Sequence, residues 1–313
     1  MRHAKTGGAR FSRGHFLKMG GTGLAGAALL GSGALAGCGG GGGAEGDDIV
    51  FSWGPDDTGV LPKMIDAFNN QGNGFKVNYR EMPSDTGEYF DQLRTQFQAG
   101  ASDIDVIGGD VIWPAQFAGT GYISDLSDRF TDSDEFLPGP MEAMRYEDGI
   151  FGVPWYTDAG LLYYRKDLLE KAGFSAPPKT WEELIEQAKK TQQDEGLPFG
   201  IVFQGAEYEG GVVNALEYIW TSGGEVLEGE DQVVIDSPEA RRGLEIERSM
   251  ISDGVAPEGV SQYKEQESAT LFLSGDSVFM RNVPRMYALA SEPAESSIDP
   301  EQIGIAALPV AKE

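Results

Sequence analysis

The chain has 313 residues with 50 acidic and 24 basic side chains, and its formal net charge is −26. A charge of this sign and size argues against nucleic acid and anionic lipid headgroups as partners, because both would be repelled. The two histidines, His3 and His15, and the single cysteine, Cys38, lie near the N-terminus. The remainder therefore lacks the side chains for Ser-His-Asp or Cys-His catalysis and for histidine-based zinc sites. We expect no cofactor and no metal.

Residues 1–37 are predicted to be an export signal. Its cations precede a weakly apolar Gly/Ala/Leu stretch over 19–36, as in secretory signals. Leu35-Ala36-Gly37-Cys38 resembles a lipobox, which implies lipidation of Cys38; the alternative is a stray cysteine in a secretory signal. Residues 12–18 also resemble a twin-arginine signal with Gly14 in place of the second arginine, so the export route stays open. Removal of 1–37, with five cations and no acids, leaves 276 residues and a net charge of −31.

A Gly-rich tether over 38–48 follows the signal and has nothing to bury. We expect it to hold a globular protein at the outer face of the cytoplasmic membrane. No later stretch has the roughly 18 continuous apolar residues of a transmembrane helix.

Short apolar runs alternate with amphipathic helices along the rest of the chain, which predicts an α/β fold. In the first half we expect strands at 49–53, 76–82 and 105–111, and helices at 60–69 and 88–99. Ligands of open α/β sheets gather at the carboxyl ends of strands. This makes Trp53, Asp57 and Trp113 candidate ligand residues, although each could be structural.

Residues 152–173 carry Trp155, Tyr156 and Asp158 close together, before a strand-like piece at 160–164 and a helix at 166–172. Aromatic faces beside a carboxylate suit a sugar, since rings cover its C–H face and carboxylates accept from its hydroxyls. The alternative is that the two rings are core aromatics and the aspartate caps a turn.

A second α/β unit follows. Thr180 and Glu183 have the spacing of a capping box, and the apolar spacing after them places Trp181 in the core. Further helices are expected at 210–222, 237–253 and 268–274, and strands at 200–203, 277–280 and 303–310.

Four segments resemble the extracellular solute-binding proteins of ABC importers, in the carbohydrate-binding group that includes maltose- and trehalose-binding proteins. They are the lipobox with its tether, residues 152–173 with 177–184, residues 203–210 with 220–224, and residues 304–309. The resemblance implies a two-lobe periplasmic-binding-protein-like fold of the maltose-binding type, whose lobes close like a hinge. We place the first lobe at 49–155 and 304–313, and the second at 156–303.

The resemblance also implies ligand contacts. Asp110 matches a first-lobe acid, Tyr156 and Asp158 match an aromatic-plus-carboxylate pair, and Glu209 matches a second-lobe acid. We rank Trp155 behind these residues, as packing. Val283 stands where the family usually has a tryptophan that stacks on a pyranose ring. Family members also continue for about another hundred residues, so we expect a C-terminally truncated chain.

The leading hypothesis is a monomeric, membrane-anchored receptor that captures an extracellular sugar, such as trehalose or maltose, and delivers it to the permease subunits of an ABC importer. No bond is made or broken, so we expect no catalytic residues. A receptor for another polar solute, such as glycerol-3-phosphate, is an alternative. A carboxylate-based glycosidase is a second one, and a non-functional fragment a third.

Overall fold

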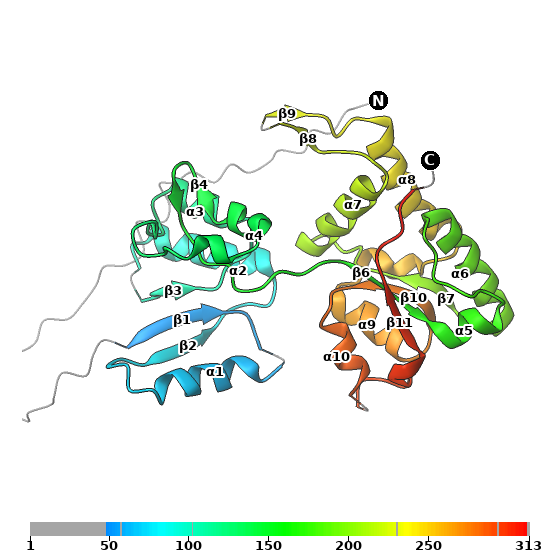
Figure 1. The fold of residues 1–313 in the computed structure, drawn as a ribbon, viewed down its shortest axis with the longest axis horizontal. Helices are drawn as coiled ribbons and strands as arrows, with labels where there is room; N and C mark the ends of the chain where they lie inside the picture. The colour runs from blue at the N-terminus through cyan, green and yellow to red at the C-terminus, as the bar shows by residue number, and fades with distance from the viewer. Residues whose placement is uncertain (1–47, 57, 102, 230, 293, 312–313) are drawn as a thin grey trace, which may run out of the picture. The chain divides into compact units, whose positions relative to one another are not determined.

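The computed structural model of the protein describes residues 48–56, 58–101, 103–229, 231–292 and 294–311 (Figure 1). The predicted signal, the lipidation residue Cys38 and the candidate Asp57 lie outside these residues.

A three-stranded parallel sheet organises the first lobe. Strand β1 (Ile49–Trp53) lies between β2 (Val77–Glu81) and β3 (Val106–Ile107). The other elements of this lobe are α1 (Val60–Asn69), α2 (Thr86–Gln98), α3 (Pro114–Gly119), the 3-10 helix η1 (Ser133–Glu135), α4 (Pro138–Ala143), β4 (Arg145–Tyr146) and β5 (Gly149–Ile150). The carboxyl end of β1 therefore points Trp53 and the following loop to one edge of the sheet, as expected.

A four-stranded mixed sheet organises the second lobe, in the order β11 (Ile303–Ala306), β6 (Leu161–Arg165), β10 (Ser277–Asn282) and β7 (Phe199–Val202). Strand β10 pairs in parallel with β7 and antiparallel with β6. The remaining elements are α5 (Lys166–Lys171), α6 (Trp181–Glu195), α7 (Glu209–Thr221), β8 (Leu227–Glu228), β9 (Gln232–Val233), α8 (Pro238–Ser252), η2 (Glu258–Gln262), α9 (Glu265–Leu273), α10 (Met286–Ala290) and η3 (Pro300–Gln302). All six residues of β10 are buried, which makes it the central strand of this lobe.

The predicted start of α6 is confirmed. The Thr180 hydroxyl accepts from the backbone N–H of Glu183 at 3.2 Å, and the Glu183 carboxylate accepts from the N–H of Thr180 at 3.3 Å. This reciprocal cap fixes the first turn and directs Trp181 into the core, where it is 1% exposed. Its indole N–H donates to the Thr221 hydroxyl at 2.9 Å, so its polar atom is also satisfied.

The final strand differs from the prediction. The sequence analysis places residues 304–313 in the first lobe, but β11 pairs antiparallel with β6 of the second sheet. Val310 then forms a parallel bridge with Thr180 at the start of α6. The apolar pattern of this segment predicts a strand but does not indicate which strand it pairs with. The backbone N–H and C=O groups of a strand can form hydrogen bonds equally well with the edge of either sheet.

Two element boundaries also differ. The strand expected at 105–111 pairs over Val106–Ile107 only, and the Gly108-Gly109 pair that follows continues as a loop. Helix α9 starts at Glu265, three residues before the expected position. Its first turn is fixed by the Glu267 carboxylate, which accepts from the backbone N–H of Lys264 at 2.9 Å.

A partly buried carboxyl on α8, that of Glu247, gives a stability test. Burial raises the pKa of Glu247 to about 7, so the folded state binds a proton that the unfolded state has released. The stability that this extra proton contributes is fully present below the pKa of the unfolded state and is lost as pH rises through about 7. Glu247→Gln removes the buried charge, and we expect it to raise the free energy of unfolding by about 2 kcal/mol at pH 8.

Urea unfolding of Glu247→Gln and the unchanged protein at pH 5 and pH 8 measures this gain, which should be much smaller at pH 5. Glu245→Gln is the matched control, since Glu245 lies on the same helix and is exposed. Equal stabilities of Glu247→Gln and the unchanged protein at pH 8 would contradict the expectation.

Candidate functional site

The crossover segment, residues 151–160, joins β5 to β6 without regular secondary structure. It carries Trp155 and Tyr156, whose side chains are large and apolar but remain 49% and 65% exposed. Rings this exposed are not fully buried core residues, although Trp155 packs against the rings of Phe51 at 5.4 Å and Trp53 at 5.3 Å. The prediction that Trp155 serves mainly in packing agrees with these contacts, and its half-exposed ring also makes it a further candidate for ligand contact.

These two rings and that of Trp53 at the end of β1 form an aromatic row, defined as Trp53, Trp155 and Tyr156. The rings of Trp53 and Trp155 are 5.3 Å apart and tilted by 40°, and Tyr156 meets Trp53 edge-on at 6.2 Å. Gly108 makes room for Trp53: a Cβ at this position would lie 1.6 Å from the indole Cε3. The structure thus brings the end of β1 and the crossover segment together, and a side chain at 108 would push the Trp53 ring out of the row.

The charges of the predicted ligand carboxylates Asp110, Asp158 and Glu209, or of groups near them, shift pKa values around the aromatic row. Burial, followed by the negative charges of Asp110 and Glu265, raises the pKa of Glu209. Burial also raises the pKa of Asp158, while the cations Arg285 and Arg281 oppose that shift. Asp110 therefore acts on Glu209, and Arg281 acts on both Glu209 and Asp158.

Tyr156 belongs to the same environment. Burial and then the charge of Asp158 raise the pKa of its phenol, Arg285 lowers it, and Asp110 raises it. Its hydroxyl accordingly stays protonated at neutral pH and can donate a hydrogen bond. Charge effects thus link Tyr156 to Asp158 and Asp110, and Glu209 to Asp110, while the Tyr156 ring contacts Trp53; that these residues form one ligand site stays a prediction.

Local structure explains two of these positions. Asp110 follows β3, and its carboxylate accepts from the N–H of Ile112 at 3.2 Å, which holds the loop in a tight turn. Glu209 is the first residue of α7, where the helix dipole favours a negative charge.

Trp113 lies elsewhere. It is 4% exposed and packs against Tyr89, Phe90 and Phe117 in the first-lobe core. Pro114 begins α3 directly after it. The loop position was consistent with a ligand residue, but the buried ring leaves no face for a ligand.

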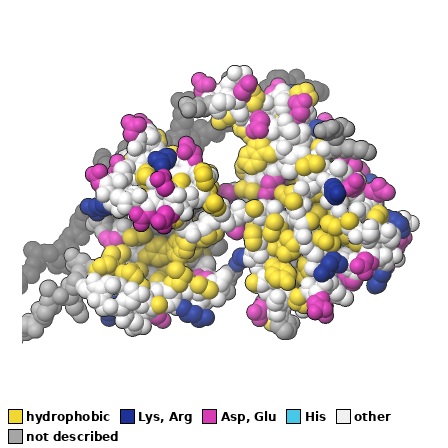
Figure 2. Space-filling view, viewed as in Figure 1, with side chains coloured by type: hydrophobic (Ala, Val, Ile, Leu, Met, Phe, Trp, Pro, Cys, Tyr) yellow, Lys and Arg dark blue, Asp and Glu magenta, His cyan; other side chains and the backbone are white. Residues whose placement is uncertain are grey.

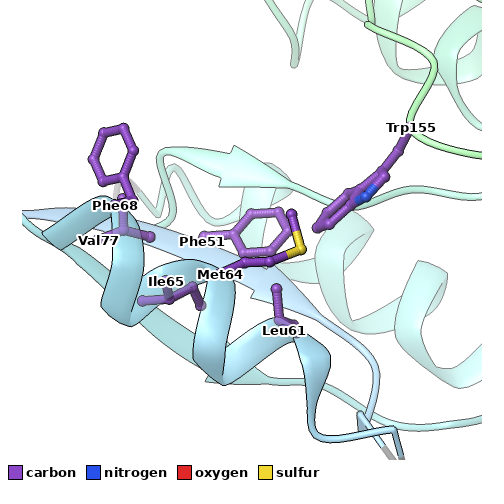
Figure 3. Close-up of a pocket in the computed structure, with 7 residues that line it drawn as sticks. All are labelled: Phe51, Leu61, Met64, Ile65, Phe68, Val77 and Trp155. Carbon is purple, nitrogen blue, oxygen red and sulfur yellow. The ribbon is translucent and has the colours of Figure 1, made fainter. Parts of the chain in front are cut away.

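An apolar pocket of about 210 Å³ lies beside the aromatic row (Figure 3). It is lined by Phe51, Leu61, Met64, Ile65, Phe68, Val77 and Trp155. Figure 2 shows hydrophobic side chains gathered over this part of β1 and α1. Its lining offers almost no hydrogen-bond partners, so it does not suit a polyhydroxylated ligand.

Sequence reasoning missed the two arginines that act on Asp158. Arg281 lies in β10 and is 4% exposed; Arg285 precedes α10. One signal was present: a single arginine inside the apolar run Val278 to Asn282 requires a buried partner, because an unpaired charge there is costly.

Comparison with known proteins supports the fold and the class. The family model of bacterial extracellular solute-binding proteins matches residues 54–313. A probable ABC transporter-binding protein of Deinococcus radiodurans is 36% identical over 254 residues, or 79% of this chain and 59% of the relative. A putative binding protein of Brucella abortus is 28% identical over 78% of this chain and 58% of its own length. The chain thus spans less than two thirds of these curated relatives.

Solved structures agree. Maltose-bound MalE3 of T. maritima is 43% identical with a TM-score of 0.78, covering 84% of this chain and 68% of that one. A solute-binding protein of Agrobacterium radiobacter K84 in complex with ribitol is 25% identical with a TM-score of 0.73, covering 86% and 68%. The predicted two-lobe periplasmic-binding fold of the maltose-binding type is confirmed. The chain belongs to the family of bacterial extracellular solute-binding proteins.

Proposed function

We propose that the protein is the solute-binding component of an ABC importer and captures an extracellular sugar, specifically an α-linked disaccharide such as maltose or trehalose. The relative from D. radiodurans is described as an ABC transporter-binding protein. The T. maritima structure, at 43% identity, holds maltose. The first similarity supports the class of function, and the second supports a sugar as the ligand.

One observation carries the proposal: the aromatic row includes Tyr156, whose phenol lies within electrostatic reach of Asp158 and Asp110, and Asp110 also acts on Glu209. The rings would cover the C–H faces of a pyranose. The carboxylates would accept from its hydroxyls in charge-assisted hydrogen bonds, which are about twice as strong as neutral ones. Since these groups come from both lobes and the crossover, hinge closure on the sugar would complete the site.

A second candidate is a glycerol-3-phosphate receptor. An sn-glycerol-3-phosphate-binding periplasmic protein of Rhizobium meliloti is 28% identical over 163 residues, or 46% of this chain. Arg285, whose charge acts on Asp158 and Tyr156, favours an anionic ligand. Three carboxylates in the same environment outweigh it, because they repel a phosphate dianion. A neutral sugar or polyol therefore fits better.

The glycosidase alternative is set aside. Burial does raise the pKa of Asp158 and Glu209, which is the direction that a general acid needs. The family, however, consists of solute-binding proteins, and the relatives are described as binding proteins. With raised pKa values, Asp158 and Glu209 gain protons at a higher pH than ordinary carboxylates do. Sugar binding would therefore begin to weaken at a higher pH during acidification.

The proposed location is the outer face of the cytoplasmic membrane, with Cys38 as the lipid anchor and permease subunits as partners of a monomeric receptor. Among the helices that the structure describes, none has the length and apolar character needed to cross a membrane.

Isothermal titration calorimetry of the purified chain with maltose, trehalose, ribitol and sn-glycerol-3-phosphate tests the proposal. We expect saturable, one-to-one binding of maltose or trehalose and none of glycerol phosphate. Thermal unfolding of the same sample, followed by circular dichroism, establishes that it is folded. A cooperatively unfolding sample that binds no saccharide would refute the proposal, and one that binds only glycerol phosphate would favour the second candidate.

A further inference from the structure

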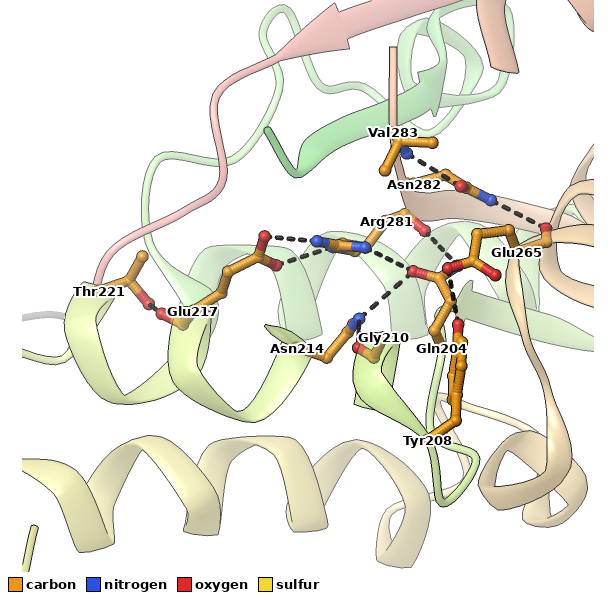
Figure 4. A network of polar contacts seen from close by, with 10 residues as sticks. All are labelled: Gln204, Tyr208, Gly210, Asn214, Glu217, Thr221, Glu265, Arg281, Asn282 and Val283. Carbon is orange, nitrogen blue, oxygen red and sulfur yellow. Dashed lines mark hydrogen bonds and ion pairs between the residues drawn. The ribbon is translucent and has the colours of Figure 1, made fainter. Parts of the chain in front are cut away.

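A buried ion pair joins the central strand of the second lobe to α7. The Arg281 Nε donates to the Glu217 Oε2 at 2.7 Å, and its Nη2 donates to the other carboxylate oxygen (Figure 4). The third guanidinium nitrogen, Nη1, donates to the Gln204 side-chain oxygen at 2.7 Å. Both partners are shielded from water, with side-chain exposures of 5% and 15%. The planar guanidinium therefore has all three nitrogens engaged in one fixed geometry.

Gln204 extends the contact into a network. Its side-chain nitrogen donates to the Ser268 hydroxyl at 3.0 Å and to the Arg281 carbonyl at 3.1 Å. The Asn214 amide nitrogen donates to the Gln204 oxygen at 3.3 Å and to the Gly210 carbonyl at 2.9 Å. The loop after β7, the first turns of α7, the start of α9 and β10 are thus tied together by buried side chains.

The crossover segment rests directly on the ion pair at Gly160. A Cβ on this residue would lie 2.2 Å from the Glu217 Oε1 and 2.8 Å from the Arg281 Nη2. Any side chain here would displace either the pair or the backbone. Gly160 comes two residues after Asp158, so the position of the ion pair limits where that carboxylate can lie.

The same network reaches the other proposed ligand carboxylate. The Gly210 carbonyl, held by Asn214, belongs to the residue that follows Glu209. Independently of this geometry, the charge of Arg281 lowers the pKa of both Asp158 and Glu209, in opposition to burial. One buried arginine thus acts on two carboxylates that lie in different segments of the chain.

Stability alone is a poor reason for such a pair. Replacing a buried ion pair by apolar residues of similar volume is often neutral or stabilising, because desolvation offsets the attraction between the charges. What the pair supplies is a fixed geometry, since a bidentate contact allows one relative position of its two elements. Fixed geometry is what a binding site built from separate segments requires.

We propose that the Arg281–Glu217 pair, together with Gln204, is a positioning device that sets the crossover residues Tyr156 and Asp158 in register with Glu209. These are positioning residues, which act through the ligand-contacting groups rather than on the ligand. The inference rests on the proposed function, because its readout is the binding of a sugar.

The double variant Arg281→Met with Glu217→Met tests it by calorimetry with maltose and trehalose at several pH values. We expect binding of the saccharide that the unchanged protein takes to be at least about tenfold weaker, with little change in unfolding temperature. The acid limb of the affinity-against-pH profile should also move to higher pH, because Arg281 no longer favours the ionised carboxylates. A purely structural pair would not move that limb.

Arg165→Met with Asp167→Met is the matched control. This pair is also bidentate, at 2.8 and 2.7 Å, and lies at the opposite end of β6 from Gly160. We expect it to leave the affinity unchanged. Gly160→Ala, which keeps both charges, provides a second route if the double variant does not fold, and should also weaken binding about tenfold.

The outcomes separate the two proposals. If the unchanged protein binds no saccharide, the proposed function fails first. Suppose instead that the unchanged protein binds a saccharide. If the folded double variant, or Gly160→Ala in its place, then binds with the same affinity, the positioning inference is overturned while the proposed function stands. Weaker binding by both double Met variants, at Arg281 and Glu217 and at the control pair Arg165 and Asp167, would also overturn it. The effect would then not be specific to this network.

Discussion

Asp158→Asn is expected to weaken sugar binding by about 10- to 100-fold while leaving the fold intact. Asn keeps the size of the side chain but not its charge. A hydrogen bond to a charged group contributes about 1.5–3 kcal/mol, and each 1.4 kcal/mol is about tenfold in affinity. Calorimetry with the saccharide that the unchanged protein binds measures the loss directly.

The free energy of unfolding of Asp158→Asn should rise, whereas its affinity for the sugar falls. Because burial raises the pKa of Asp158, the folded state gains a proton relative to the unfolded state as pH falls, and stability declines as pH rises through the folded value. At neutral pH the ionised carboxylate therefore destabilises the fold, and Asn relieves this. Asp134→Asn, at an exposed acid outside the candidate site, is the control and should change neither property. Unchanged affinity in Asp158→Asn would remove this residue from the site.

Trp181→Ala is expected to lower the free energy of unfolding by about 3–5 kcal/mol, the usual cost of removing a large buried aromatic side chain. Trp181 is 1% exposed and packs against the Tyr218 ring at 4.6 Å. Its loss also leaves the Thr221 hydroxyl without the indole donor. Urea unfolding at pH 7 measures the change.

Trp220→Ala is the matched control, because Trp220 lies on α7 but is half exposed. We expect less than about 1 kcal/mol for it, as for most surface substitutions. Similar losses in the two variants would mean that Trp181 does not anchor the second-lobe core.

Local patterns predicted the local structure well. The Thr180–Glu183 cap and the inward face of α6 follow from residues only a few positions apart, and such short-range rules are the most reliable in a sequence. The aromatic-plus-carboxylate pattern at Tyr156 and Asp158 likewise led to a segment that is exposed and aromatic in the structure. Which ligand the segment contacts stays a prediction.

Long-range pairings were not predictable in the same way. Arg281 meets Glu217 and Gln204, which are 64 and 77 residues away along the chain, and no spacing rule connects them. The partner of β11 was misassigned for the same reason. Trp113 shows a third limit: a loop position does not specify on which side of the backbone the ring packs.

Val283 illustrates a departure that only the packing explains. It stands where the resemblance implies a tryptophan, and its side chain packs against the Tyr163 and Met286 cluster of the second lobe. The Tyr163 hydroxyl donates to the Val283 carbonyl at 2.9 Å. Under the proposed function, the aromatic surface for the sugar would come instead from Trp53, Trp155 and Tyr156, on β1 and the crossover segment.

The aromatic row has an optical consequence. Two indoles 5.3 Å apart and tilted by 40° are close enough for their electronic transitions to couple, and the tilt gives the pair a chiral near-ultraviolet dichroism signal. A molecule that separates the rings or covers one of them would change both this signal and the tryptophan emission. The protein therefore carries its own unlabelled reporter at the end of β1, whose response can be read by spectroscopy.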